Sequence, residues 1–136
     1  MFYDNDVDLV RAVAEHAIAG FVAGEATIAV ATTRHIAAFE AAMVDRGVDV
    51  AGARADGAWT AVDASHAMSR FIVDDRPDPD AFDAEIGRLV RDATAGGRTA
   101  RVYGEMVALL WDDGHVGAAI ELESLWNALR VEVEFT

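Results

Sequence analysis

Cysteine and lysine are absent from this 136-residue chain, and proline occurs only twice. Without cysteine, disulfide bonds and thiolate metal sites are excluded, and the cytoplasm is the expected compartment. All eleven basic residues are arginines, so a Schiff-base lysine, a pyridoxal-phosphate anchor and a P-loop lysine are excluded as well. Serine occurs only at Ser65, Ser69 and Ser124, and none of them sits in a G-x-S-x-G nucleophile elbow.

Long hydrophobic runs are also missing. The longest, residues 26–31 and 106–111, are far shorter than the roughly 18 apolar residues of a membrane span. Residues 1–6 are acidic rather than basic, unlike a signal peptide. The length suits one domain with a core of its own. We therefore expect a single cytoplasmic domain over residues 1–136.

Acidic residues dominate the charge. The formal net charge is −13, which disfavours nucleic acids and anionic membranes as partners because both require a cationic face. The ordinary consequence of this acidity is solubility.

Strand-like and helix-like segments alternate along the chain, which predicts an α/β fold with three layers, α/β/α, around a mostly parallel sheet. Ser65 is a candidate cap for one helix, and Asp78 followed by Pro79 is a strong helix start. Strands are expected at residues 2–3, 26–32, 58–63, 99–103 and 131–136. Helices are expected before Gly24 and at about 34–45, 65–72, 79–95, 105–111 and 116–129, with a helical turn at 48–55.

Ligands of open α/β sheets bind at the carboxyl ends of the strands. We expect the residues at these ends to converge on one edge of the domain. They are Asp4, Thr32, Thr33, Arg34, His35, Asp63, His66, Gly104, Glu105 and Met106.

The run from Thr32 to His35 offers hydroxyls, a guanidinium and an imidazole that could grip a small polar or anionic ligand. Alternatively, a threonine caps the next helix, and Arg34 and His35 pair with nearby acids. A metal site of Asp63, His66 and His35 is a weaker hypothesis, because no H-x-x-x-H spacing supports it. The alternative is that Asp63 caps the following helix. We therefore predict no metal and no cofactor.

Glu105 is the acid we most expect to touch a ligand. Gly104 beside it permits close backbone approach, but no partner for general-base catalysis is evident, so no catalytic residue is predicted. Met106, Trp111 and Trp126 could line a pocket for an apolar molecule, or could be ordinary core residues.

Several segments along the chain carry a family resemblance. They are F-V-A-G-E (21–25), A-T-T-R-H (31–35), G-V-D-V (47–50), D-G-A-W-T-A-V-D-A (56–64), R-P-D-P-D-A-F (76–82), R-V-Y-G-E-M-V-A-L-L-W (101–111) and L-E-S-L-W-N (122–127). Together these segments resemble the MEDS domain, the methanogen/methylotroph DcmR-type sensory domain. The resemblance covers nearly the whole chain, and it implies a regulatory role alongside kinases, anti-sigma-type regulators or transcription regulators. Relative to the family, the chain looks trimmed at both ends.

MEDS domains are in turn similar to the KaiC and RecA ATPase core, in which a glycine-rich P-loop follows the first strand. Here Asp4, Asp6 and Asp8 stand where a phosphate cradle needs glycines, a lysine and a hydroxyl. A triphosphate would meet like charge, so we expect a RecA/KaiC-like core without a functional P-loop.

The leading interpretation is a non-catalytic sensory module that binds a small organic ligand or docks to a signalling protein. One alternative is a degenerate nucleotide-binding domain that does not hydrolyse its nucleotide. Another is a structural interaction domain, with a homodimer formed through the terminal strand at 131–136 as an exposed edge.

Overall fold

A computed structural model describes residues 6–133 and residue 135. At its centre is a three-stranded sheet in the order β2-β1-β5, and both neighbouring pairs are parallel. The strands are β1 (Ala26–Ala31), β2 (Trp59–Asp63) and β5 (Ala100–Gly104). The prediction of a parallel sheet is confirmed, whereas the strand expected at residues 2–3 and the candidate ligand residue Asp4 lie outside the described residues.

The middle strand β1 is buried along its whole length, as expected for a parallel strand covered on both faces. Its side chains alternate between two separate cores. Ile28 and Val30 belong to the larger core on one face, while Ala29 and Ala31 belong to the core on the other face.

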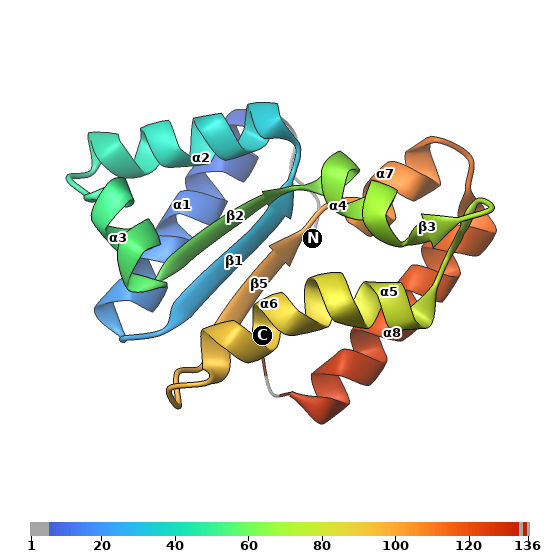
Figure 1. Ribbon diagram of the computed structural model, residues 1–136. Coiled ribbons are helices and arrows are strands. Elements are labelled where there is room, and N and C mark those ends of the chain that lie inside the picture. The colour runs from blue at the N-terminus through green and yellow to red at the C-terminus, as the bar shows by residue number, and fades with distance from the viewer. Residues whose placement is uncertain (1–5, 134, 136) are drawn as a thin grey trace.

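Three helices cover the alanine side of β1 (Figure 1): α1 (Asp6–Val22), α2 (Thr33–Asp45) and α3 (Val50–Asp56). Small residues let α1 approach the sheet closely. A Cβ atom on Gly20, for example, would lie 3.0 Å from Oγ1 of Thr27 on β1. The core on this face includes Val13, Ala14, Ala17, Phe39, Met43 and Trp59.

The opposite face is covered by α4 (Ala64–Phe71), α5 (Pro79–Phe82), a π-helical turn η1 (Asp83–Gly87), α6 (Arg88–Thr94), α7 (Met106–Asp112) and α8 (Val116–Glu132). Aromatic rings join these helices edge to face, with centroids 5.4 Å apart for Phe71 and Phe82 and 5.5 Å apart for Phe82 and Trp126. Two helical layers thus enclose the sheet, and the predicted three-layer α/β/α class is confirmed.

The region around the third predicted helix needs two corrections. Asp63, not Ser65, caps α4, since its side chain accepts a hydrogen bond from the N–H of His66. Ile72 was expected in the helix but belongs to a short hairpin of β3 (Ile72–Val73) and β4 (Arg76–Pro77). The chain leaves the helix at Ile72 because the turn residues Asp74 and Asp75 both adopt positive φ, 52° and 62°, as type I′ hairpin turns require.

At the other end of the hairpin, the predicted helix start holds. Asp78 caps α5, and Pro79 is its first residue. The terminal strand expected at 131–136 is wrong for Val131 and Glu132, which continue α8. The N–H of Val133 bonds the carbonyl of Leu129, so the helical hydrogen-bond pattern continues through Glu132, and the chain becomes extended only at Val133. Phe135 makes one parallel bridge with Ala100.

None of the helices within residues 6–133 is both long enough and apolar enough to cross a membrane.

Candidate functional site

The carboxyl ends of the three strands meet at one edge of the sheet. The register pairs Ala31 with Asp63 and Val30 with Gly104, so the residues that follow β1 and β5 emerge side by side. The expected convergence therefore holds for the described strand ends.

Glu105 lies at the centre of this edge. Its Oε1 accepts the backbone N–H of Thr32 at 2.9 Å, and its Oε2 accepts the Tyr103 hydroxyl at 2.8 Å. The same Oε2 lies 2.6 Å from Nδ1 of His35. The Glu105 side chain is only 11% exposed, and its backbone N–H bonds the carbonyl oxygen of Val30. One carboxylate thus joins the ends of β1 and β5 to the first turn of α2.

The imidazole of His35 lies between two carboxylates. Nδ1 contacts Glu105, while Nε2 lies 3.3 Å from Oδ1 of Asp6. Nε2 is buried and makes no hydrogen bond with any described residue. The ring stacks on Phe39 with centroids 5.8 Å apart. Packing and Glu105 together fix its orientation.

Asp6, the first residue of α1, also belongs to this group of side chains. Its Oδ2 lies 2.6 Å from Nη1 of the exposed Arg34. The guanidinium of Arg34 first, and then the nearby imidazole of His35, lower the pKa of the Asp6 carboxyl below its ordinary value of 3.8. The arrangement therefore holds a carboxylate against a guanidinium and an imidazole. We call Asp6, Arg34, His35 and Glu105 the strand-end cluster.

Asp63 and its neighbours form a separate, structural group. Its Oδ1 accepts the Thr33 hydroxyl and its Oδ2 accepts the N–H of His66, both at 2.9 Å. These bonds, with the one from His66 first, lower the pKa of Asp63. Thr32 caps α2 through the N–H of His35. The capping alternatives for Thr32 and Asp63 are thus present, His66 is exposed, and no group of metal-ligating side chains occurs among the described residues.

Beside Asp6, an apolar groove of about 410 Å³ runs between α1 and α2. Most of its lining residues are aliphatic, and two arginines line it as well. The lining residues are Asp6, Val7, Val10, Ala38 and Ala42, with Arg11 and Arg46.

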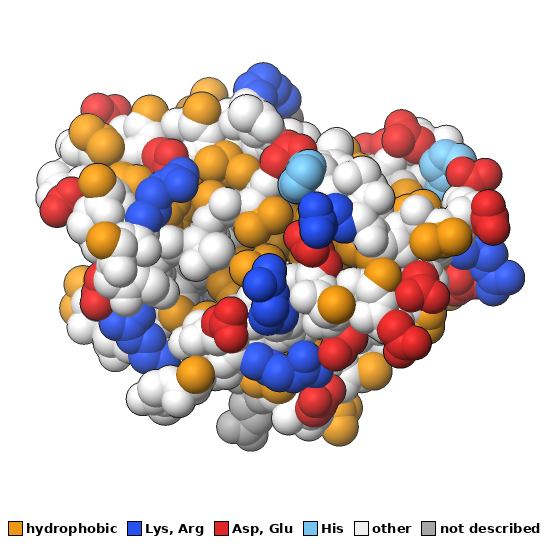
Figure 2. All heavy atoms as spheres, viewed as in Figure 1, with side chains coloured by type: hydrophobic (Ala, Val, Ile, Leu, Met, Phe, Trp, Pro, Cys, Tyr) orange, Lys and Arg blue, Asp and Glu red, His pale blue; other side chains and the backbone are white. Residues whose placement is uncertain are grey.

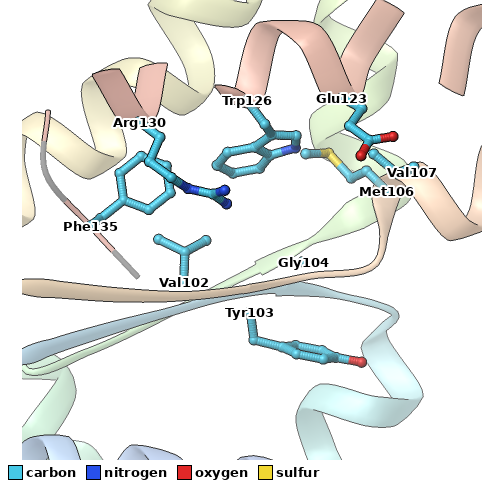
Figure 3. Close-up of a pocket in the computed structure, with 9 residues that line it drawn as sticks. All are labelled: Val102, Tyr103, Gly104, Met106, Val107, Glu123, Trp126, Arg130 and Phe135. Atoms are coloured by element: carbon cyan, nitrogen blue, oxygen red, sulfur yellow. The ribbon is translucent and has the colours of Figure 1, made fainter. Parts of the chain in front are cut away.

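Two other predicted residues, Met106 and Trp126, lie on the opposite face of β5 from Tyr103 (Figure 3). Met106 is buried and, with Gly104 and Trp126, lines a cavity of about 420 Å³. Trp111 does not line this cavity and is 55% exposed on α7. The suggested pocket of Met106, Trp111 and Trp126 therefore needs correction, because Trp111 lies near the far end of α7, five positions after Met106.

Sequence reasoning missed two members of the site. Asp6 was assigned only to a lost phosphate cradle, and Tyr103 only to the end of a strand. Their roles depend on Arg34 and Glu105, which they meet in space. The sequence signal for Tyr103 is that it lies two residues before Glu105, the acid predicted to contact a ligand.

The model of one protein family, described as the MEthanogen/methylotroph, DcmR Sensory domain (MEDS), matches residues 1–136, the whole chain. Comparisons with curated proteins and with solved structures found no match.

Proposed function

The chain belongs to the MEDS family of sensory domains, and on that premise we propose that it senses a small organic anion without catalysing a reaction. One observation carries the proposal. Asp6, which lines the apolar α1–α2 groove, places its carboxylate on Arg34 and beside His35. Asp6 thus occupies the position that the anionic group of a ligand would take.

A carboxylate of a ligand can replace Asp6 in its ion pair with Arg34. The side chains of Arg34 and Asp6 are 75% and 52% exposed, and exposed ion pairs contribute only about 0–1 kcal/mol. A guanidinium matches the geometry of any carboxylate. A soluble carboxylate can therefore compete with Asp6 at modest cost.

The groove supplies binding energy for the rest of the ligand. Its volume of about 410 Å³ falls within the usual range for small-molecule sites, and such sites combine apolar walls with a few polar groups. Val7, Val10 and the two alanines provide those walls. Asp6, which also lines the groove, lies against Arg34 and His35 and so places these polar groups next to it. The ligand class is accordingly a carboxylate with a short aliphatic body.

Ligand binding would be read out through α1. Release of Asp6 frees the first turn of α1 from α2, and a ligand that favours this second packing shifts the balance between the two states. His35 links the same event to Glu105 and hence to the end of β5.

The test is a thermal-shift and calorimetric titration with straight-chain monocarboxylates of increasing length. We expect stabilisation that grows with chain length until the groove is filled. Arg34→Gln should abolish binding, whereas Asp6→Asn should strengthen it severalfold, because the internal competitor is lost. Arg70→Gln, which removes another exposed ion pair, is the matched control and should bind normally.

Two outcomes contradict the proposal. Stronger stabilisation by ATP or GTP than by any carboxylate would indicate a degenerate nucleotide-binding domain. Failure of every ligand, together with concentration-dependent dimerisation, would indicate a structural interaction domain.

A further inference from the structure

The α1–α2 groove has cationic side chains near both of its ends. Of the described residues that line it, two are basic, Arg11 from α1 and Arg46 from the end of α2, and only Asp6 is acidic. Asp6 is the first residue of α1 and contacts Arg34, the second residue of α2, so it marks one end of the groove. Arg46 is the C-cap of α2 and marks the other end.

Helical geometry gives the separation of the two ends. Ala38 and Ala42 precede Arg46 along the groove at intervals of four residues, so the three lie on one face of α2. Arg46 is therefore about 12 Å from Ala38 along the helix axis. Glu15 of α1 contacts Arg46, which places Arg11 about one helical turn before the level of Arg46. A ligand would reach these two arginines only across an aliphatic segment of several carbon atoms.

Arg46 is held by its carboxylate partner less closely than the other paired arginines are. Figure 2 shows acidic side chains beside basic ones over one face of the molecule. Every other arginine–carboxylate ion pair among the described residues is 3.1 Å long or shorter, whereas Nη2 of Arg46 lies 3.6 Å from Oε1 of Glu15. Arg11 pairs with Asp8, and both side chains are exposed. Exposed ion pairs contribute little to stability, so a carboxylate of a ligand can compete for both guanidinium groups.

We propose that the ligand of the α1–α2 groove is an α,ω-dicarboxylate. The inference rests on the proposed function and adds the second charged end of the ligand. One carboxylate takes the place of Asp6 on Arg34, and the other binds Arg46 and Arg11. A guanidinium holds a carboxylate through two parallel hydrogen bonds. A monocarboxylate would gain nothing from the second pair of arginines, so Arg46 and Arg11 determine the specificity.

The test is isothermal titration calorimetry of the intact chain with acids of equal chain length. The pairs are hexanoate and adipate, octanoate and suberate, and decanoate and sebacate. We expect the dicarboxylate of the best-fitting length to bind about fivefold more tightly than its monocarboxylate. The net charge of −13 favours the less charged acid, because like charges repel. A preference for the dicarboxylate therefore reports recognition within the groove.

Two variants change the second carboxylate site in opposite directions. Arg46→Gln removes the guanidinium, so the two acids of a pair should bind equally. Glu15→Gln removes the internal competitor, so the preference for the dicarboxylate should grow severalfold. Arg70→Gln makes the same change of charge as Arg46→Gln in an exposed ion pair outside the groove and should keep the preference. The Arg46 and Glu15 side chains are 36% and 64% exposed, so these variants should fold.

Separate results would overturn the second carboxylate site and the proposed function. If monocarboxylates bind but dicarboxylates bind no more tightly, the second site is wrong and the proposed function stands. If the preference for a dicarboxylate survives Arg46→Gln, another group recognises the second carboxylate, and the second site is again wrong. If no acid of either kind binds, both the second site and the proposed function are wrong.

Discussion

Oε2 of Glu105 lies 2.6 Å from Nδ1 of His35, a residue 70 positions earlier in the chain. The contact joins the residue after β5 to the first turn of α2. Since Glu105 also accepts hydrogen bonds from Thr32 and Tyr103, three elements depend on one largely buried carboxylate.

The first prediction concerns Glu105→Gln. An amide presents donors where the carboxylate offers only acceptors, so at least one of the surrounding donors loses its partner. Leaving a buried polar group unsatisfied costs about 1–3 kcal/mol, and we expect the free energy of unfolding in urea to fall by that amount. Glu123→Gln makes the same chemical change on an exposed position of α8 and should have little effect. Equal stability of the two variants would show that Glu105 is not a structural hub.

The second prediction concerns the cap of α4. Asp63→Ala should destabilise the protein by about 1 kcal/mol, the usual cost of losing an N-cap. Asp63→Asn keeps a side-chain oxygen for the N–H of His66, so it should lose much less at neutral pH. A similar loss in both variants would contradict the capping role.

The same residue gives a pH dependence. The folded-state pKa of Asp63 is lowered from its ordinary value of 3.8, so the native state binds fewer protons than the unfolded state in that range. Its stabilisation is therefore fully present above about pH 4 and is lost as the pH falls through the lowered pKa. Asp63→Asn should make the fall of stability in acid shallower, measured by thermal unfolding across acidic pH.

The third prediction concerns the β3–β4 turn. Asp75 has φ of 62°, a conformation that costs most L-residues about 1–2 kcal/mol and glycine almost nothing. Asp75→Gly should raise stability by about 0.5 kcal/mol after the greater flexibility of glycine in the unfolded chain is subtracted. Asp75→Ala should lower it, since alanine lacks the local hydrogen bonds that let Asp tolerate this region. A stabilising alanine would mean that the turn rearranges.

Periodicity was enough to predict the layers of the fold. The apolar run of β1 and the helical spacing of Phe39 and Met43 in α2 are local signals, and they appear as buried elements in the structure. The strand ends could be predicted to lie together because the carboxyl ends of parallel strands are at the same edge of the sheet. Glu105 could be singled out because it follows such an end directly.

What escaped prediction depends on choices between similar local options or on distant partners. Asp63 and Ser65 were both predicted as possible caps of the same helix, and only the end of β2 at Asp63 decides between them. The hairpin turn has positive φ at both Asp74 and Asp75 but contains no glycine. The sequence therefore lacks the usual signal for a turn of this type. The contact of Asp6 with Arg34 spans 28 positions, and no local pattern encodes it.

The last prediction concerns Thr27, whose hydroxyl is buried in β1 without a hydrogen-bond partner among the described residues. An unsatisfied buried hydroxyl carries a desolvation cost, and an apolar group of the same shape avoids it. Thr27→Val should therefore raise the free energy of unfolding by about 1 kcal/mol. Thr27→Ser keeps the hydroxyl and removes a methyl group, so it should be destabilising. The opposite result, a destabilising Thr27→Val with a neutral Thr27→Ser, would contradict this prediction. It would mean that the hydroxyl bonds ordered water in the cavity of about 510 Å³ that Thr27 lines, so that removing the hydroxyl no longer stabilises the protein.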